Sequence, residues 1–307
     1  MPDALVAAGE SFTNELKRTK DGWTGGGVTV RISSEGQVLI AAPSNGLLWV
    51  RMAWHHDWPE RAVCLADAWE RSYVDLEWKQ IAKERRLSPW YFLVYDGVRT
   101  DGFGVEVQPN ALACWEVDGK GHALRLDLRA GSEPVRLGNR TLEAVHILER
   151  KGATGESAFQ AGRAFCRMMC PCPRLPKEPF YGYNDWYCAY GNNTATNFLK
   201  DAAFGSACAK GLANRPYVVM DDGWEKNSPM EMARSFGGYD SGMGPWDAAG
   251  PHFGMDMPTF CRKIAALGAR PGLWYRPLRS WPGVPSDRRR RFPRPSDAGR
   301  SHSSGTP

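Results

Sequence analysis

The sequence predicts a multidomain α and β protein, with an antiparallel β-sandwich followed by a shorter run of alternating strands and helices. Three observations predict this. Short runs of β-branched and aromatic residues fill the first half, turn pairs such as Asp96-Gly97 separate them, and helical periodicity is clear only after residue 150. With 307 residues, the chain is long enough for one large domain or two ordinary ones.

The predicted sandwich covers residues 1–150. Its clearest strand is "ALRLDLR", in which Leu124, Leu126 and Leu128 share one face and charged residues share the other. Many short strands with dense turns and no helical period between them are typical of an antiparallel sandwich. The strands that we predict are residues 27–32, 36–41, 46–52, 90–96, 111–118 and 123–129.

A connecting segment is predicted over residues 151–179, with helical spacing at 156–169 and a proline-rich stretch at 170–179. After it, strands and helices alternate as far as residue 279, which implies parallel pairing of the strands. The predicted order is strand 180–187, helix 194–211, strand 216–222, helix 257–268 and strand 270–277.

The stretch "PYVVMDDGWE" (216–225) ends a predicted strand in two adjacent carboxylates, Asp221 and Asp222. A strand end with an Asx turn and a packing Trp would explain it structurally. Yet ligands of βα folds bind beyond the carboxyl ends of the strands, where the long loop 225–256 also begins. We therefore expect a ligand-binding edge, formed by Asp221, Asp222, Trp186, Trp224, Trp274 and Arg276.

These residue types favour sugar binding by Asp221 and Asp222 over catalysis of bond cleavage by the same two residues. A retaining glycosidase needs its two carboxyl groups about 5–5.5 Å apart on opposite sides of the scissile bond, and neighbours on one strand cannot easily straddle a substrate. Two carboxylates do accept hydrogen bonds from sugar hydroxyls, and an indole packs on the apolar face of the ring.

Several segments together resemble a known family. "GYNDWY", "VVMDDGWE" and "GARPGLWYRPL" are similar to the first three barrel strands of the α-galactosidase (melibiase) clan, close to glycoside hydrolase family 36. "YVDLEW", "SPWYFLVYDG" and "ALRLDLR" resemble the β-sandwich that precedes the barrel there. The resemblance covers residues 20–279 and implies that 180–279 forms the first three βα units of an incomplete TIM (β/α)8 barrel.

The resemblance also implies roles. Asp221 and Asp222 would hold galactose hydroxyls, typically O4 and O6, and Trp186 and Trp274 would be aromatic residues of the sugar subsite. The nucleophile on the fourth barrel strand and the acid/base on the sixth have no counterpart before residue 279. We thus expect a fragment of a retaining hydrolase that acts on α-galactosides, or of a raffinose-synthase-like transglycosylase. We expect this chain by itself to be inactive. The alternative is a carbohydrate-binding or pseudoenzyme module.

Residues 280–307 form an Arg/Pro/Ser-rich tail with no Val, Ile or Leu after Val284. A natural disordered tail could have this composition, but an out-of-frame or misassembled end fits better, because a fourth βα unit belongs there. "RRRR" at 288–291 supplies four of the +5 net charges, so the charge does not indicate nucleic-acid binding.

The remaining composition excludes several classes. No signal pattern and no apolar run of membrane-spanning length is visible, so we expect a cytoplasmic protein without a membrane partner. The eight cysteines are expected to be free thiols. No metal or cofactor motif is present, and retaining glycosidase chemistry requires none. A glycoside or oligosaccharide is the expected partner, and the sequence does not indicate an oligomeric state.

Overall fold

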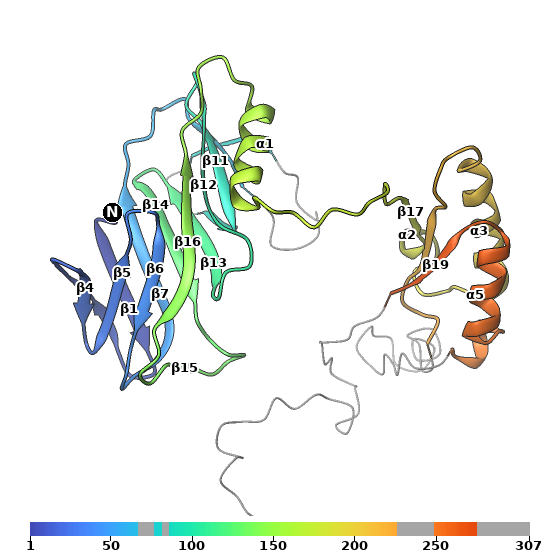
Figure 1. The fold of residues 1–307 in the computed structure, drawn as a ribbon, viewed down its shortest axis with the longest axis horizontal. Helices are drawn as coiled ribbons and strands as arrows, with labels where there is room; N and C mark the ends of the chain where they lie inside the picture. Colours follow the sequence, from blue (N-terminus) through green and yellow to red (C-terminus); the bar gives the residue numbers. More distant parts are fainter. Residues whose placement is uncertain (67–76, 82–85, 226–248, 275–307) are drawn as a thin grey trace, which may run out of the picture. The chain divides into compact units, whose positions relative to one another are not determined.

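The structure is a computed structural model that describes residues 1–66, 77–81, 86–225 and 249–274. The chain divides into two compact units, Met1–Pro173 and Arg174–Pro307. The first consists of two antiparallel sheets with one helix, and the second contains a short parallel sheet with helices (Figure 1).

One sheet of the first unit has seven strands in the order β10-β13-β14-β7-β1-β2, with β15 paired to β7. The long strand β7 is central and pairs with both β14 and β1. The strands are β1 (Ala4–Gly9), β2 (Thr13–Glu15), β7 (Gly46–His55), β10 (Arg86–Pro89), β13 (Leu112–Asp118), β14 (Gly121–Asp127) and β15 (Val135–Arg136).

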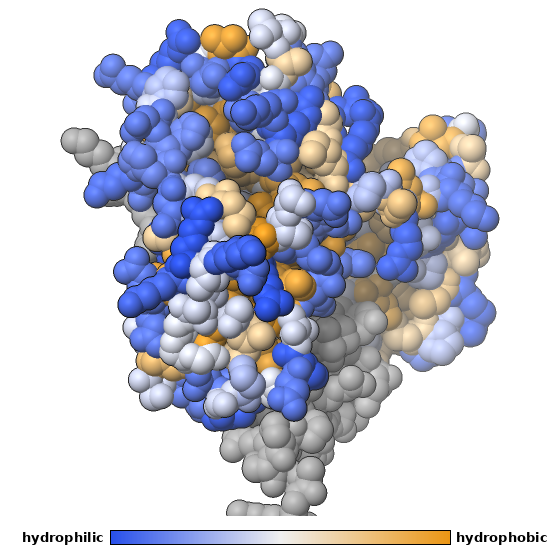
Figure 2. Space-filling view, turned by 60° about the vertical axis from the view of Figure 1, so that its left-hand side comes forward, coloured by the Kyte–Doolittle hydropathy of each residue, from blue (hydrophilic) through white to orange (hydrophobic). Residues whose placement is uncertain are grey.

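The other sheet has nine strands in the order β3-β4-β5-β6-β16-β12-β11-β8-β9. They are β3 (Lys17–Thr19), β4 (Gly22–Gly25), β5 (Val28–Ile32), β6 (Gln37–Ala41), β8 (Val63–Ala66), β9 (Lys79–Gln80), β11 (Tyr91–Tyr95), β12 (Thr100–Val105) and β16 (Leu142–Arg150). Side chains of both sheets form one apolar core, in which Trp23, Phe92 and Trp115 are fully buried. The forward face in Figure 2 is mainly hydrophilic, and apolar side chains show in the recesses between polar ones.

The alternation predicted for residues 123–129 is confirmed, because Leu124, Leu126 and Leu128 are all buried. Each of the six predicted strands lies on an observed strand. The prediction missed the remaining strands of this unit, among them the nine-residue β16 and also β1. The segment "ALVAAG" of β1 is rich in small residues and therefore has little β-propensity. Pairing with β7 and β2 makes it a strand nonetheless.

Helix α1 (Ala158–Met169) begins at the capping box of Ser157 and Gln160. The sequence placed this helix in a connecting segment, but Phe165 and Met169 are buried against Leu93 of the nine-stranded sheet. A Cβ at Gly102 would lie 2.6 Å from the Phe165 ring, so the sheet has no side chain there. The helix is therefore part of the first unit.

The second unit has three parallel strands in the order β17-β18-β19. Its elements are β17 (Gly182–Asn184), α2 (Trp186–Ala189), α3 (Ala195–Cys208), β18 (Tyr217–Met220), the 3-10 helix η1 (Pro251–Phe253), α5 (Met257–Ala266) and β19 (Arg270–Leu273). Phe198, Phe253 and Phe260 form the centre of its core. The predicted strands and helices occur in the predicted order, and the short helices α2 and η1 occur in addition. Three strands make an open sheet, so the barrel itself stays a prediction.

One boundary differs from the prediction. The first strand was expected over residues 180–187, but β17 ends at Asn184 and α2 begins at Trp186. The Oδ1 of Asn184 accepts a hydrogen bond from the backbone N–H of Trp186 at 2.8 Å, which turns the chain out of the sheet.

Within the described part of the chain, no helix has the length and apolar character needed to span a bilayer.

Candidate functional site

The carboxyl ends of the three parallel strands meet at one edge of the sheet. Asn184 is in register with Val219 of β18, and Met220 is in register with Leu273 of β19. The residues that follow these strands are Asp185 and Trp186, Asp221 and Asp222, and Trp274. Four of the predicted site residues thus lie at one edge, namely Asp221, Asp222, Trp186 and Trp274. Trp224 packs in the core instead. Arg276 lies outside the described residues, together with 226–248 of the predicted loop.

Asp221 is the centre of a hydrogen-bond network at this edge. Its Oδ2 accepts from Nδ2 of Asn184 at 2.5 Å, and its Oδ1 accepts from the backbone N–H of Asp222 at 2.8 Å. Its own backbone N–H donates to Oδ1 of Asp185 at 2.7 Å. With 8% of its surface exposed, Asp221 has a carboxylate that is held in one orientation by its neighbours.

Asp222 is only 1% exposed, and the turn that follows it is tightly packed. Gly223 has a φ of +112°, and a Cβ there would lie 2.4 Å from the carbonyl oxygen of Gly191. The backbone N–H of Gly223 donates to Oε2 of Glu225 at 2.9 Å. Only glycine fits this turn, so the "DDGW" spacing reflects backbone geometry as well as side-chain chemistry.

Three polar residues of this network were not among the predicted site residues, namely Asp185, Asn193 and Glu225. All are buried, with 5%, 3% and 0% of their surface exposed. Nδ2 of Asn193 donates to the backbone carbonyls of Asp221 and Asp222 at 3.3 and 3.1 Å. Asp185 and Glu225 could have been found, because each lies directly beside a residue that the sequence did single out.

Burial raises the pKa of the Asp185 carboxyl above its usual range, and the nearby carboxylate of Asp221 adds to this effect. Hydrogen bonds from the backbone N–H of Asp221 and from the side chain of Asn193 act in the opposite direction. The site therefore combines a cluster of carboxylates with amide donors that hold them in place.

The three predicted indoles differ in position. Trp224 is 3% exposed and packs in the core of the second unit, so it offers almost no face to a ligand in this structure. Its Nε1 donates to the backbone carbonyl of Trp274 at 3.0 Å, which links β18 to the end of β19. Trp186 and Trp274 are both partly exposed, and these two can present an apolar surface to a sugar ring.

The described residues contain no group of three or more His, Cys, Asp or Glu arranged to hold a metal ion. All eight cysteines are free thiols in the structure.

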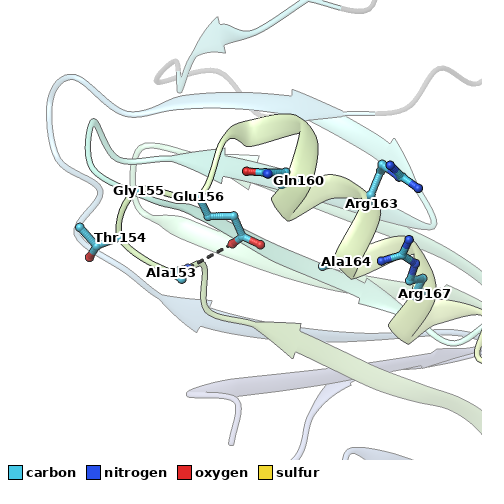
Figure 3. A pocket seen from close by; sticks show the side chains of 8 residues that line it. All are labelled: Ala153, Thr154, Gly155, Glu156, Gln160, Arg163, Ala164 and Arg167. Atoms are coloured by element: carbon cyan, nitrogen blue, oxygen red, sulfur yellow. Dashed lines mark hydrogen bonds between the residues drawn. The ribbon is translucent and has the colours of Figure 1, made fainter.

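A separate hollow of about 480 Å³ lies beside the start of α1 in the first unit (Figure 3). Arg163 and Arg167 project from the helix beside it. Its carboxylate, Glu156, is already bound by the guanidinium of Arg150 at 2.7 and 2.9 Å and by the backbone N–H of Ala153. The hollow therefore lacks a free acid opposite its arginines and is a weaker candidate than the sheet edge.

No protein-family model matches the sequence, and no curated protein matches it.

The chain is structurally similar to GH36 α-galactosidases. For the GH36 α-galactosidase AgaA from Geobacillus stearothermophilus in complex with stachyose, the identity is 12% and the TM-score 0.47, over 82% of this chain and 36% of that one. For the α-N-acetylgalactosaminidase NagBb from Bifidobacterium bifidum in complex with Gal-NHAc-DNJ, the identity is 12% and the TM-score 0.48, over 88% of this chain and 52% of that one. For the α-galactosidase from Lactobacillus brevis, the identity is 13% and the TM-score 0.42, over 89% of this chain and 41% of that one. The chain thus spans between about a third and a half of the length of these structures.

Proposed function

We propose that the second unit is the sugar-binding part of an α-galactosidase-type glycoside hydrolase, in which Asp221 and Asp222 bind hydroxyl groups of a galactoside. One observation carries the proposal. The two carboxylates end β18 at the same sheet edge at which two partly exposed indoles, Trp186 and Trp274, follow the neighbouring strands. Ligands of parallel βα sheets bind at this edge.

The carboxylate of Asp221 is suited to a hydroxyl-rich ligand. An ionised carboxylate has about four acceptor sites, and the Asn184 amide and the Asp222 backbone N–H occupy two of them. Two sites remain for ligand hydroxyls. Because its neighbours already fix its orientation, little conformational entropy is lost when the ligand binds. Asp222 is nearly fully buried, so a ligand reaches it only by displacing atoms that cover it.

The geometry supports a role of the pair in binding over a role in bond cleavage. Retaining glycosidases place two carboxyl groups about 5–5.5 Å apart across the scissile bond, whereas Asp221 and Asp222 are neighbours at the end of one strand and share a hydrogen bond. This same observation favours a second candidate function, a carbohydrate-binding module that performs no hydrolysis. A transglycosylase would use the same binding residues.

Calorimetric titration of the full chain with methyl α-D-galactoside tests the binding. We expect Asp222→Asn to weaken the affinity about tenfold or more, since a hydrogen bond to a charged group contributes about 1.5–3 kcal/mol. Glu178→Gln is the matched control, because Glu178 forms an exposed ion pair with Arg270 at the opposite end of the sheet. Absence of binding, or equal affinity of Asp222→Asn and wild type, would overturn the proposal.

An assay with 4-nitrophenyl α-D-galactoside tests whether this chain is itself catalytic. We expect no release of nitrophenol, because Asp221 and Asp222 are neighbours on one strand and cannot act from opposite sides of the scissile bond. Release by the full chain, lost on replacement of one of its carboxylates, would mean that another acid of this chain performs the hydrolysis. Binding of methyl α-D-galactoside without release is expected for a hydrolase fragment and for the binding module alike.

A further inference from the structure

The first unit contains a cleft of about 750 Å³ at one end of its β-sandwich, between the inner faces of the two sheets. Nothing in the proposed function of the second unit uses it. The volume lies within the range of small-molecule binding sites, about 300–1,000 Å³. Residues of β7, β13 and β14 line it on one side and residues of β12 and β16 on the other.

The seven-stranded sheet contributes an aromatic wall. Trp54 and His122 are paired across β7 and β14, and their rings stack with centroids 5.3 Å apart and an interplanar angle of 14°. Trp115 packs 6.1 Å from Trp54 and is fully buried. Trp54 and His122 are each partly exposed and both line the cleft, so part of this aromatic wall is accessible to a ligand.

The nine-stranded sheet contributes charged side chains on the face that is otherwise apolar and turned toward the core. Glu149 of β16 is in register with Phe103 of β12, so both side chains lie on the same face of the sheet. Phe103 is in the core, and the same face therefore carries Glu149 and, two residues from Phe103 along β12, Asp101. Carboxylates at core-facing positions of a sandwich oppose the hydrophobic pattern, and departures of this kind concentrate at functional sites.

These charged groups are available to a ligand to different degrees. Oδ1 of Asp101 accepts from the backbone N–H of Gly152 at 2.9 Å and lies 3.3 Å from Nε of Arg99. Glu149 and Lys151 are exposed, and among the described residues neither makes an ion pair or a side-chain hydrogen bond. The cleft thus offers one carboxylate that is held in place, one exposed carboxylate and an ammonium donor around the aromatic wall.

We propose that this cleft is a second carbohydrate-binding site, which takes an uncharged saccharide. The C–H face of a sugar ring would pack on Trp54, and its hydroxyls would donate to Asp101 and Glu149 and accept from Lys151. The mixed signs of the rim favour a neutral ligand over an anion or a cation. A purely apolar ligand would desolvate the carboxylates without giving them partners.

The full chain tests the proposal by saturation-transfer NMR and calorimetric titration with four probes: methyl α-D-galactoside, methyl α-D-glucoside, stachyose and maltotriose. We expect at least one probe to bind the Asp222→Asn variant, in which the sheet edge of the second unit is weakened. In that background, Trp54→Ala is expected to reduce affinity about tenfold or more, the loss typical of an aromatic anchor.

Trp49→Ala is the matched control. Trp49 is on the same strand as Trp54, but its side chain lies on the opposite face of the sheet, with the guanidinium of Arg125 over its ring at 4.4 Å. It should retain the affinity of its parent. Because Trp54→Ala could also disturb the core, Glu149→Gln provides a second variant that leaves the aromatic wall intact. Its control is Glu143→Gln on the same strand, whose carboxylate is bound by Gln37 at 2.7 Å.

We expect Glu149→Gln to weaken binding several-fold and Glu143→Gln to leave it unchanged. The proposal is overturned if no probe binds the Asp222→Asn variant. It is also overturned if a probe binds but neither Trp54→Ala nor Glu149→Gln weakens it, since the ligand would then occupy another surface.

Discussion

Asn184 and Asp221 connect the ends of two neighbouring parallel strands through a hydrogen bond of 2.5 Å between Nδ2 and Oδ2. Asp221 is 8% exposed, so loss of this donor leaves a buried carboxylate with one partner fewer. We expect Asn184→Ala to lower the free energy of unfolding of the second unit by about 1.5 kcal/mol. Urea unfolding measures the change, and hydrogen exchange of the peptide 216–225 locates it.

Asn192→Ala is the control for this variant. The amide of Asn192 donates to the backbone carbonyl of Ala189 at 3.1 Å in an exposed turn, where a hydrogen bond contributes little. If the two variants were equally stable, the contact between Asn184 and Asp221 would have no structural importance.

Replacement of Asp185 by Asn should stabilise the second unit at neutral pH. Burial raises the folded-state pKa of Asp185, so its contribution to stability is fully present below the unfolded pKa of about 3.9 and is lost as the pH rises through the folded pKa. Asn removes the buried charge and keeps an Oδ1 that can accept from the N–H of Asp221, now at 2.7 Å. Unfolding curves at pH 4 and pH 7 should show that the advantage of the variant grows with pH; an advantage that shrinks would contradict the burial effect.

The first unit should become less stable in mild acid because of His122. Burial lowers the pKa of this imidazole to about 4, from an ordinary value of 6.5. Between these values the unfolded chain binds a proton that the folded chain does not, so stability is complete above pH 6.5 and falls as the pH drops towards 4. The loss is roughly 3 kcal/mol at most.

His122→Phe isolates this effect, because the ring still packs against Trp54 and Phe103 but cannot be protonated. We expect the difference in unfolding free energy between wild type and His122→Phe to change across pH 6.5 to 4 and to be constant above it. A difference that is independent of pH would show that His122 titrates normally.

Gly223→Ala should destabilise the second unit by about 2 kcal/mol or more, through its positive φ and the close approach of the Gly191 carbonyl. Gly254→Ala is the matched control, because Gly254 also has a positive φ, of +79°, but has open space around a Cβ. We expect a loss of about 1 kcal/mol there. Thermal unfolding of the two variants compares them directly, and equal losses would mean that the carbonyl contact is relieved by a small shift.

Much of the secondary structure was predictable from the sequence, because it depends on patterns within a few residues. The alternation of Leu124, Leu126 and Leu128 predicts a strand with one buried face. The spacing over 194–211 and 257–268 predicts the helices α3 and α5, and "PYVVMDD" predicts that two carboxylates leave a strand end. Because carboxyl ends of parallel strands share one edge, the sequence also predicted that Trp186, Asp221 and Trp274 would lie together.

The tertiary structure alone decided which of these side chains face outward and which support them. Trp224 looks like a ligand platform in sequence, yet the packing of α5 and η1 around β18 places it in the core. In sequence, Asp185 lies within a predicted strand and Glu225 begins a predicted loop. In the structure both are buried, and they accept hydrogen bonds from the backbone N–H groups of Asp221 and Gly223. The cleft at the end of the sandwich brings Trp54, Phe103 and Glu149 together from strands far apart in the chain. Burial and such encounters depend on long-range pairing of strands, and no local periodicity encodes that pairing.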